Sequence, residues 1–167
     1  MPSSPLTPIA IVRSTAKDRP LLDRLWMLFQ HDMSSSGVFP DGEGRFRRQR
    51  LDAALTEPGW GCYVLRLGAS PVGICLIRGF DDEERIISSF FVVRGARRAG
   101  HGRAAVRHLT RQHRGRWAVA FQDANKPAAE FWRAVAADAD PTWTHEHREV
   151  PGRLDLPHDS WVRFTVQ

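Results

Sequence analysis

The residues best suited to chemistry form a short basic turn in the middle of the chain, Arg97-Arg98-Ala99-Gly100-His101-Gly102-Arg103. An apolar run that ends at Val93 precedes this turn, and a helix-forming segment follows it. Backbone N–H groups in the first turn of a helix have no acceptor inside the helix and carry a partial positive charge. Glycines let a ligand approach these groups closely, so the turn predicts a phosphate or pyrophosphate site.

A second element, Asn125-Lys126-Pro127-Ala128-Ala129-Glu130-Phe131-Trp132-Arg133, follows one strand later. Arg97-x-x-Gly100-x-Gly102 and Asn125-x-x-Ala128-x-x-Phe131-Trp132 resemble the two cofactor-binding motifs of the GNAT acyltransferase superfamily. The combined resemblance covers roughly residues 86–136. The Phe-Phe-Val stretch before the turn and the Phe-Trp-Arg of the last motif are similar to one bacterial GNAT subfamily of largely uncharacterised members.

The resemblance implies that acetyl-coenzyme A (acetyl-CoA) is the acyl donor. Backbone amides of residues 98–103 would meet its pyrophosphate, and nearby arginines would reach its phosphates. The backbone of Val92 and Val93 would pair with the pantetheine arm as an added strand, and Asn125 would hydrogen-bond to that arm. The expected cofactor-binding residues are Phe91, Val92, Val93, Arg97, Arg98, Ala99, Gly100, His101, Gly102, Arg103, Asn125, Phe131 and Trp132.

Three other interpretations of these elements stay open. The turn is also consistent with a glycine-rich helix start that binds no ligand. A dinucleotide-binding unit is a further alternative, but the third glycine of its motif is replaced by Ala105, and no repeated βαβ pattern surrounds it. Asn125, just ahead of Pro127, is also typical of a residue that begins a helix.

The chemistry that the resemblance implies is direct attack of an amine on a thioester. Many family members have a tyrosine in the last motif helix that protonates the leaving thiolate, but this chain has Trp132 there. The only tyrosine is Tyr63, on a predicted strand outside the motif. A thiol has a pKa of about 8.5, so its thiolate can leave without a dedicated acid.

The general base is open. Many relatives have a carboxylate just before the Phe-Phe-Val stretch, where this chain has Ser89. The candidates are His31 and Asp32 at the end of the first helix, and Glu84 at the start of the motif strand. Each of them is also consistent with a solvated surface residue.

No metal is expected, because the remaining histidines show no spacing with acidic residues that indicates a metal triad. His145-x-His147 on a strand would point both rings the same way. A third ligand is not evident in the sequence.

Composition limits the class of protein. The 167 residues fit one domain, 1–167, with 42% hydrophobic residues to fill its core. No run approaches the ~18 apolar residues of a membrane span, and the Met1–Pro5 start lacks the pattern of a secretory signal. Cys62 and Cys75 lie in apolar runs and are expected to be buried thiols, which favours a cytoplasmic protein.

The net charge of +5 and the pI of about 10.2 come mainly from arginines in three stretches, residues 45–50, 94–107 and 107–116. Coenzyme A is a polyanion and accounts for the middle stretch. The first is expected on the exposed face of a short helix, and the last on a solvated helix surface. Binding to nucleic acid is the less favoured alternative.

The pattern along the chain predicts a mixed α/β fold with a mainly antiparallel sheet of about six to seven strands and about four helices, as the resemblance also implies. Asp18 is expected to cap the first helix, and residues 34–44 to form a loop. Strands are expected at 9–12, 61–67, 72–78, 86–93, 116–121, 143–150 and 161–166, and helices at 18–29, 45–55, 100–113 and 127–135.

The main functional hypothesis is a cytoplasmic N-acetyltransferase that uses acetyl-CoA on a primary amine of a small molecule or a peptide. One alternative is a GNAT-fold module that binds acyl-CoA with little or no turnover, and another is the basic nucleic-acid-associated protein. The acceptor would meet residues 34–44 and 141–158, the least patterned parts of the chain. A monomer or a homodimer is expected.

Overall fold

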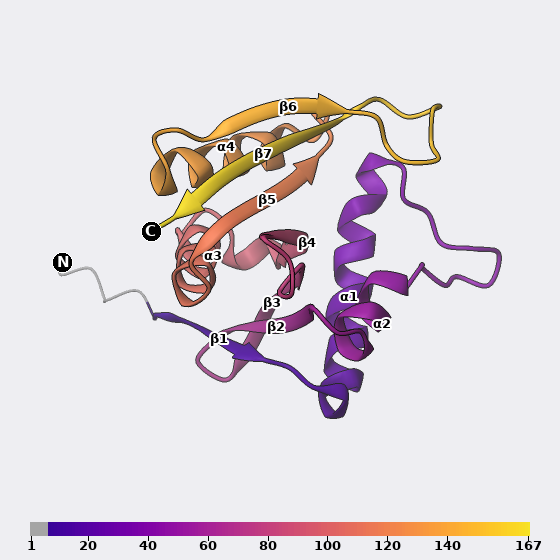
Figure 1. The fold of residues 1–167 in the computed structure, drawn as a ribbon. Helices are drawn as coiled ribbons and strands as arrows, with labels where there is room; N and C mark the ends of the chain where they lie inside the picture. Colours follow the sequence, from indigo (N-terminus) through magenta and orange to yellow (C-terminus); the bar gives the residue numbers. More distant parts are fainter. Residues whose placement is uncertain (1–6) are drawn as a thin grey trace.

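The computed structural model of the chain describes residues 7–167, and the expectation about the Met1–Pro5 start lies outside them. Seven strands form one sheet in the order β1-β2-β3-β4-β5-β7-β6 (Figure 1). Every neighbouring pair is antiparallel except β4 and β5, which are parallel. The strands are β1 (Ile9–Arg13), β2 (Trp60–Leu67), β3 (Ser70–Arg78), β4 (Glu84–Val92), β5 (Gly115–Phe121), β6 (Thr144–Arg148) and β7 (Asp159–Val166).

Helices cover both faces of this sheet, and each face has its own apolar core. On one face, Leu22, Leu25 and Trp26 pack against the β2–β4 side chains that include Phe91. On the other face, a larger core contains Trp117 and Trp132. The first face is covered by α1 (Arg19–Met33) and α2 (Gln49–Thr56), and the second by α3 (His101–Gln112) and α4 (Lys126–Ala139) (Figure 1).

The predicted fold class is confirmed, since residues 7–167 contain seven strands, mostly antiparallel, and four α-helices. Cys62 and Cys75 are buried and free, as expected. Burial raises the pKa of the Cys62 thiol to about 12, which keeps this thiol protonated at neutral pH. No helix within residues 7–167 is long and apolar enough to cross a bilayer.

Two helix starts differ from the sequence-based expectation. Asp18 does not cap α1 with its side chain. It forms a capping box with Thr15 around a short 3-10 turn that leads into the helix. The second helix begins at Gln49 and not near Arg45, because the Asp41 carboxylate accepts hydrogen bonds from the backbone N–H groups of Glu43 and Arg45. Most of the first basic stretch therefore lies in a loop.

Candidate active site

The sheet opens between its two parallel strands. Pairing between β4 and β5 covers only Glu84–Ile87 and Arg116–Val119, although β4 continues to Val92 and β5 to Phe121. We call this stretch, Ser88–Val92 of β4 facing the end of β5, the β4–β5 opening. Strands that diverge in this way leave backbone donors and acceptors available to an extended ligand.

The backbone of β4 shows which groups face the opening. The N–H of Val93 donates to the carbonyl of Val72 on β3 (2.8 Å), and the Val93 carbonyl accepts from Ala96 (2.9 Å). Because backbone groups alternate between the two edges of a strand, those of Phe90 and Val92 point toward β5. The expected contact of the Val93 backbone with a pantetheine arm is therefore not supported, and that of Val92 is retained as a proposal.

The basic turn follows β4 and begins α3, as the sequence predicts. Arg98 has φ of 63° and Gly100 has φ of 80°, a left-handed conformation that costs a non-glycine residue on the order of 1 kcal/mol. Gly100 is the N-cap of α3 and supplies no side chain to the first-turn N–H groups. No N-cap side chain therefore occupies these amides, which suits an anion.

Gly102 lies where the turn meets α4. A Cβ atom at this position would approach the Phe131 ring to 3.2 Å and the Phe90 ring to 3.6 Å. Phe90 and Phe131 stack with ring centroids 5.6 Å apart. Gly102 thus lets α3 pack closely on an aromatic cluster that borders the opening.

Trp132 belongs to the same cluster and is 6% exposed. Its ring meets Phe131 edge-on at 4.8 Å and Phe90 at 5.5 Å between centroids. An indole buried in this way is a packing element, in agreement with the inference that Trp132 is not a proton donor.

Arg97 joins three parts of the site. Its Nε donates to the Val92 carbonyl (2.7 Å), and its Nη2 lies 2.8 Å from Asp32 Oδ2, at the end of α1. Arg94 contacts the other oxygen of Asp32 at 3.1 Å. Both carboxylate oxygens are thus occupied by arginines, which does not favour Asp32 as a base, and Arg97 has partners other than a phosphate.

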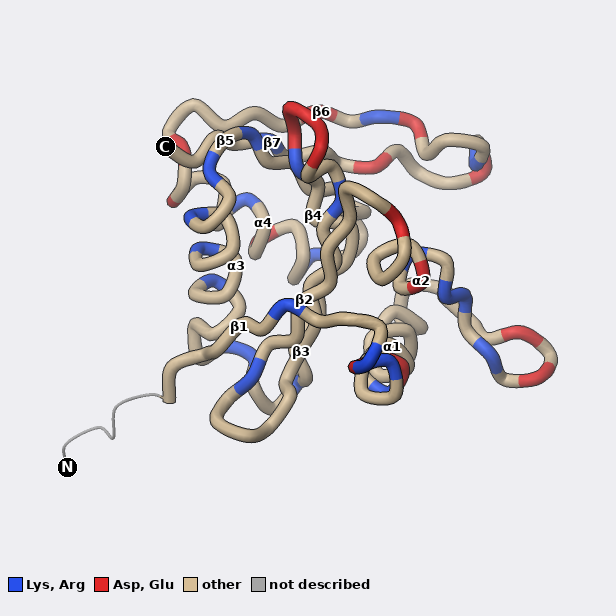
Figure 2. The backbone as a smooth tube through the Cα atoms, turned by 60° about the horizontal axis from the view of Figure 1, so that its bottom comes forward, with Lys and Arg blue, Asp and Glu red and all other residues tan. Residues whose placement is uncertain are grey.

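Arg103, expected at a phosphate, instead forms an ion pair with Asp138 of α4. The two residues line a groove of about 220 Å³ between α3 and α4, which also includes Arg107 and Arg111. Figure 2 shows the basic residues on successive turns of α3. This groove lies along the helices and not in the β4–β5 opening.

Asn125 is the N-cap of α4, and its side-chain oxygen accepts a hydrogen bond from the N–H of Ala128 (3.3 Å). This is the alternative role that the sequence allowed for it. The capping leaves the amide nitrogen of Asn125 for other contacts, so a contact with the pantetheine arm stays a prediction.

The other base candidates lie apart from one another. Glu84 is the first residue of β4, where its carboxylate lies 3.1 Å from Arg163 Nε. Four residues at about 3.3 Å each separate it from Ser88 by about 13 Å along the strand. His31 is an exposed residue in the last turn of α1. The structure therefore does not bring the three candidates together.

A β-bulge distorts β4 beside the opening, because the register to β3 shifts between Leu76, opposite Ser89, and Ile77, opposite Ile87. Ser89 Oγ is buried without a hydrogen-bond partner in residues 7–167. Arg50 of α2, read in the sequence only as part of a basic stretch, donates from Nη1 to the Ser88 carbonyl (3.1 Å). Burial of this guanidinium, with Arg78 nearby, lowers the pKa of Arg50. No sequence motif marks this contact.

Tyr63 lies on β2 in the α3–α4 core, with its hydroxyl 3.2 Å from His113 Nε2. Burial raises the pKa of Tyr63, although Arg13 lowers it in part. The β2 strand is separated from the opening by β3 and β4. This position agrees with the expectation that Tyr63 is not the missing acid.

Comparison with known proteins gives the family. Residues 22–136 match the sequence model of the acetyltransferase (GNAT) family, and the chain belongs to that family. The bacterial subfamily suggested by the Phe-Phe-Val and Phe-Trp-Arg motifs is not tested by this match. No curated protein matches the chain.

Solved structures with the same fold include an acetyltransferase from Thermus thermophilus. It is 22% identical, the match covers 96% of this chain and 99% of that chain, and the TM-score is 0.70. A GNAT acetyltransferase from Elizabethkingia anophelis, solved with acetyl-CoA bound, is 12% identical over 95% of this chain and 98% of that chain, with a TM-score of 0.67. At these identities the likeness establishes the fold alone.

Proposed function

We propose that this protein is an N-acetyltransferase that moves the acetyl group of acetyl-CoA to a primary amine of a small molecule or a peptide. The observation that carries the proposal is the β4–β5 opening beside the uncapped start of α3. Family membership and the bound acetyl-CoA in the Elizabethkingia anophelis structure support the choice of donor.

The donor fits the residues around the opening. First-turn amides of α3 would receive the pyrophosphate, because anions bind at helix N-termini. The backbone groups of Phe90 and the N–H of Val92 would hydrogen-bond to the pantetheine arm as an added strand does. Arg98 is exposed and can pair with a phosphate. Arg97 would contribute by holding the Val92 carbonyl and the end of α1 in place.

The chemistry we propose is direct attack. The lone pair of the amine nitrogen forms a bond to the thioester carbon, the C–S bond breaks, and its electron pair leaves with the coenzyme A sulfur. A backbone amide at the Ser88–Ser89 bulge would polarise the carbonyl oxygen, as in an oxyanion hole. Arg50, bound to the Ser88 carbonyl, would fix the bulge. The proton of the attacking amine passes to solvent.

We place the acceptor at the two loops named from the sequence. Residues 34–44 and the β6–β7 loop project on the same side of the molecule (Figures 1 and 2). Phe39 in the first loop is 75% exposed, and Leu154 in the second is 85% exposed. Exposed apolar side chains on these two loops would favour an amine attached to an apolar group.

The second candidate is an acyl-CoA-binding module with little turnover. The specific observation in its favour is that Asp32 and Glu84, two of the candidate bases, are paired with arginines. Thiol release from acetyl-CoA, measured against a panel of amines and peptide N-termini, separates the two functions. Amine-dependent release supports the transferase, whereas tight acetyl-CoA binding without release with any amine supports the module.

Donor binding is tested by calorimetry on Gly100→Val. We expect at least a tenfold weaker affinity for acetyl-CoA, because a branched side chain at φ of 80° displaces the first-turn amides. Gly152→Val is the matched control, since Gly152 has φ of 71° in the β6–β7 loop, outside the donor site. Unchanged affinity in a folded Gly100→Val protein would contradict the donor site.

Domain organisation, cellular compartment and oligomeric state complete the proposal. We propose that residues 1–167 act as one GNAT domain and that the protein works in the cytoplasm, where free thiols such as Cys62 and Cys75 stay reduced. We also propose that the protein is a monomer or a homodimer. Gel filtration with light scattering distinguishes the two states.

A further inference from the structure

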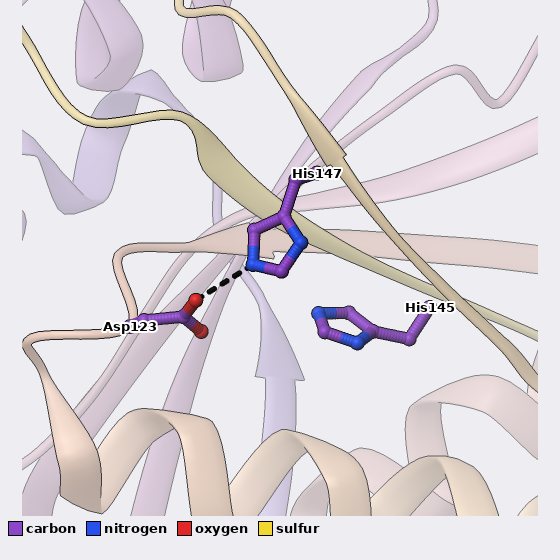
Figure 3. Close-up of side chains that lie close together, drawn as sticks. All are labelled: Asp123, His145 and His147. Carbon is purple, nitrogen blue, oxygen red and sulfur yellow. Dashed lines mark hydrogen bonds and ion pairs between the residues drawn. The ribbon is translucent and has the colours of Figure 1, made fainter.

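Two histidines and a carboxylate from distant parts of the chain meet at the edge of the sheet. His145 and His147 are on β6, and Asp123 is in the loop between β5 and α4 (Figure 3). One ligand atom from each residue lies within 4.8 Å of the other two. The histidine pair was visible in the sequence, and the structure supplies the third group that the sequence did not reveal.

The sheet topology explains this meeting. β7 lies between β5 and β6 and pairs with both. Residues two apart on a strand share a face, so His145 and His147 point the same way. Their partners on β7 are Val162 and Ser160. Val162 belongs to the α3–α4 core, so both rings lie on the face from which α4 begins, next to Asp123.

Hydrogen bonds already hold the three side chains in place. His147 Nε2 lies 2.7 Å from Asp123 Oδ2, and the fully buried Ser160 donates from Oγ to Asp123 Oδ1 at 2.7 Å. Ser160 Oγ also lies 3.1 Å from His145 Nε2. The Ser160 bond to Asp123 Oδ1 orients the carboxylate and leaves Oδ2 for an ion, which reduces the cost of assembling a metal site. The contacts made by His145 Nε2 and His147 Nε2 would be exchanged for bonds to the ion.

The donor set selects the class of ion. Two imidazole nitrogens and one carboxylate oxygen suit Zn²⁺, whereas Mg²⁺ and Ca²⁺ prefer oxygen ligands alone. Tetrahedral bonds of about 2.0–2.1 Å place ligand atoms about 3.3 Å apart. Because the present atoms lie 2.7 Å to at most 4.8 Å apart, shifts of about 1–2 Å bring them to that spacing. All three residues are exposed, so such shifts disturb no core packing.

We propose that Asp123, His145 and His147 form a zinc site that joins the edge strand β6 to the start of α4, with a fourth position open to water. The ion takes the place of the proton between His147 Nε2 and Asp123 Oδ2. Arg133, 3.4 Å from Asp123 Oδ1, is the cation that the ion must displace or tolerate. The site lies outside the proposed acetyl transfer, and its existence does not depend on that function.

The test is calorimetric titration of Zn²⁺ into protein that has been treated with a chelator and freed of any purification tag. We expect one ion per chain, a higher Tm with Zn²⁺ present, and no comparable binding of Mg²⁺. Co²⁺ in place of Zn²⁺ should give the visible absorption of a tetrahedral site. His145→Ala and His147→Ala should each weaken Zn²⁺ binding at least about tenfold.

Two further variants separate ligand loss from unfolding. Asp123→Asn preserves the shape of the side chain and removes the charge, so it should fold and still bind Zn²⁺ at least about tenfold more weakly. His108→Ala, an exposed histidine of α3, is the matched control and should bind as the unchanged protein does. Absence of saturable Zn²⁺ binding to the unsubstituted protein would overturn the proposal. So would folded His147→Ala and Asp123→Asn proteins that bind Zn²⁺ as tightly as the unsubstituted protein does.

Discussion

Replacing Trp132 separates packing from proton donation. A buried tryptophan withdraws about 150–250 Å² from water, which at about 25 cal/mol per Å² amounts to roughly 4–6 kcal/mol. Trp132→Ala also loses the edge contacts with Phe90 and Phe131, so we expect a loss of about 3–5 kcal/mol in the free energy of unfolding. Trp132→Phe keeps a ring in the cluster and should lose only about 1–2 kcal/mol.

The assay combines urea unfolding with kcat and KM for acetyl transfer, each normalised to folded protein. We expect Trp132→Phe to retain most of kcat, because the packing role needs a ring and not an N–H group. Trp117→Phe is the matched control, since Trp117 is fully buried in the same core but lies where β5 still pairs with β4. A hundredfold loss of kcat in Trp132→Phe alone, with unchanged acetyl-CoA affinity and stability, would refute this reasoning.

The remaining predictions concern three other side chains. Tyr63→Phe should lower the free energy of unfolding by about 1 kcal/mol, because the contact with His113 is lost. It should leave kcat at alkaline pH unchanged. If kcat falls at alkaline pH and this fall disappears in Tyr63→Phe, Tyr63 is the acid. Burial, with Arg85 and Arg13, lowers the pKa of His113 in the folded protein, so the unfolded chain takes up the proton first as the pH falls through about 6.5. The free energy of unfolding should therefore decrease from pH 8 toward pH 5, and His113→Gln should flatten that slope in urea titrations; an equal slope in both proteins would contradict it. Asp32→Asn should change kcat by no more than a few-fold. It should strengthen acetyl-CoA binding at low salt only, because it releases Arg97 from its ion pair. A loss of kcat above a hundredfold would show that Asp32 acts as the base.

The elements around the proposed donor site could be predicted because local patterns specify them. The apolar run that ends at Val93 indicates β4, and the glycines of the turn indicate the start of α3. Expected boundaries lay within a few residues of the observed ones, as for the 100–113 helix and α3 (His101–Gln112). The largest differences are the start of α2 and the ends of α1 and α4, which continue to Met33 and Ala139. At α2, hydrogen bonds to the Asp41 side chain hold residues 43–45 in a loop that periodicity does not detect.

Long-range contacts could not be predicted in the same way. No sequence pattern near Asp123 predicts its contact with His147, because that contact requires β7 to pair with both β5 and β6. The same holds for Arg97, which was expected at a phosphate and lies against Asp32, 65 residues earlier. Arg50 at the β4 bulge is a further example. Each of these contacts joins segments that are distant in the sequence and depends on the tertiary fold and not on local spacing.

The β4–β5 opening lies inside the sheet, where its unpaired backbone is less accessible to strands of other protein chains than at a sheet edge. Unpaired strand backbone at a sheet edge attracts further strands and promotes aggregation. Here the edges are β1 and β6, each five residues long, and β6 carries charged and histidine side chains. The unpaired backbone of β4 lies instead in the middle of the sheet, between Phe29 of α1 on one face and Phe131 of α4 on the other. A second polypeptide strand that paired there would have to place its side chains against the helices on the two faces, whereas the pantetheine arm of the proposed donor carries no such side chains.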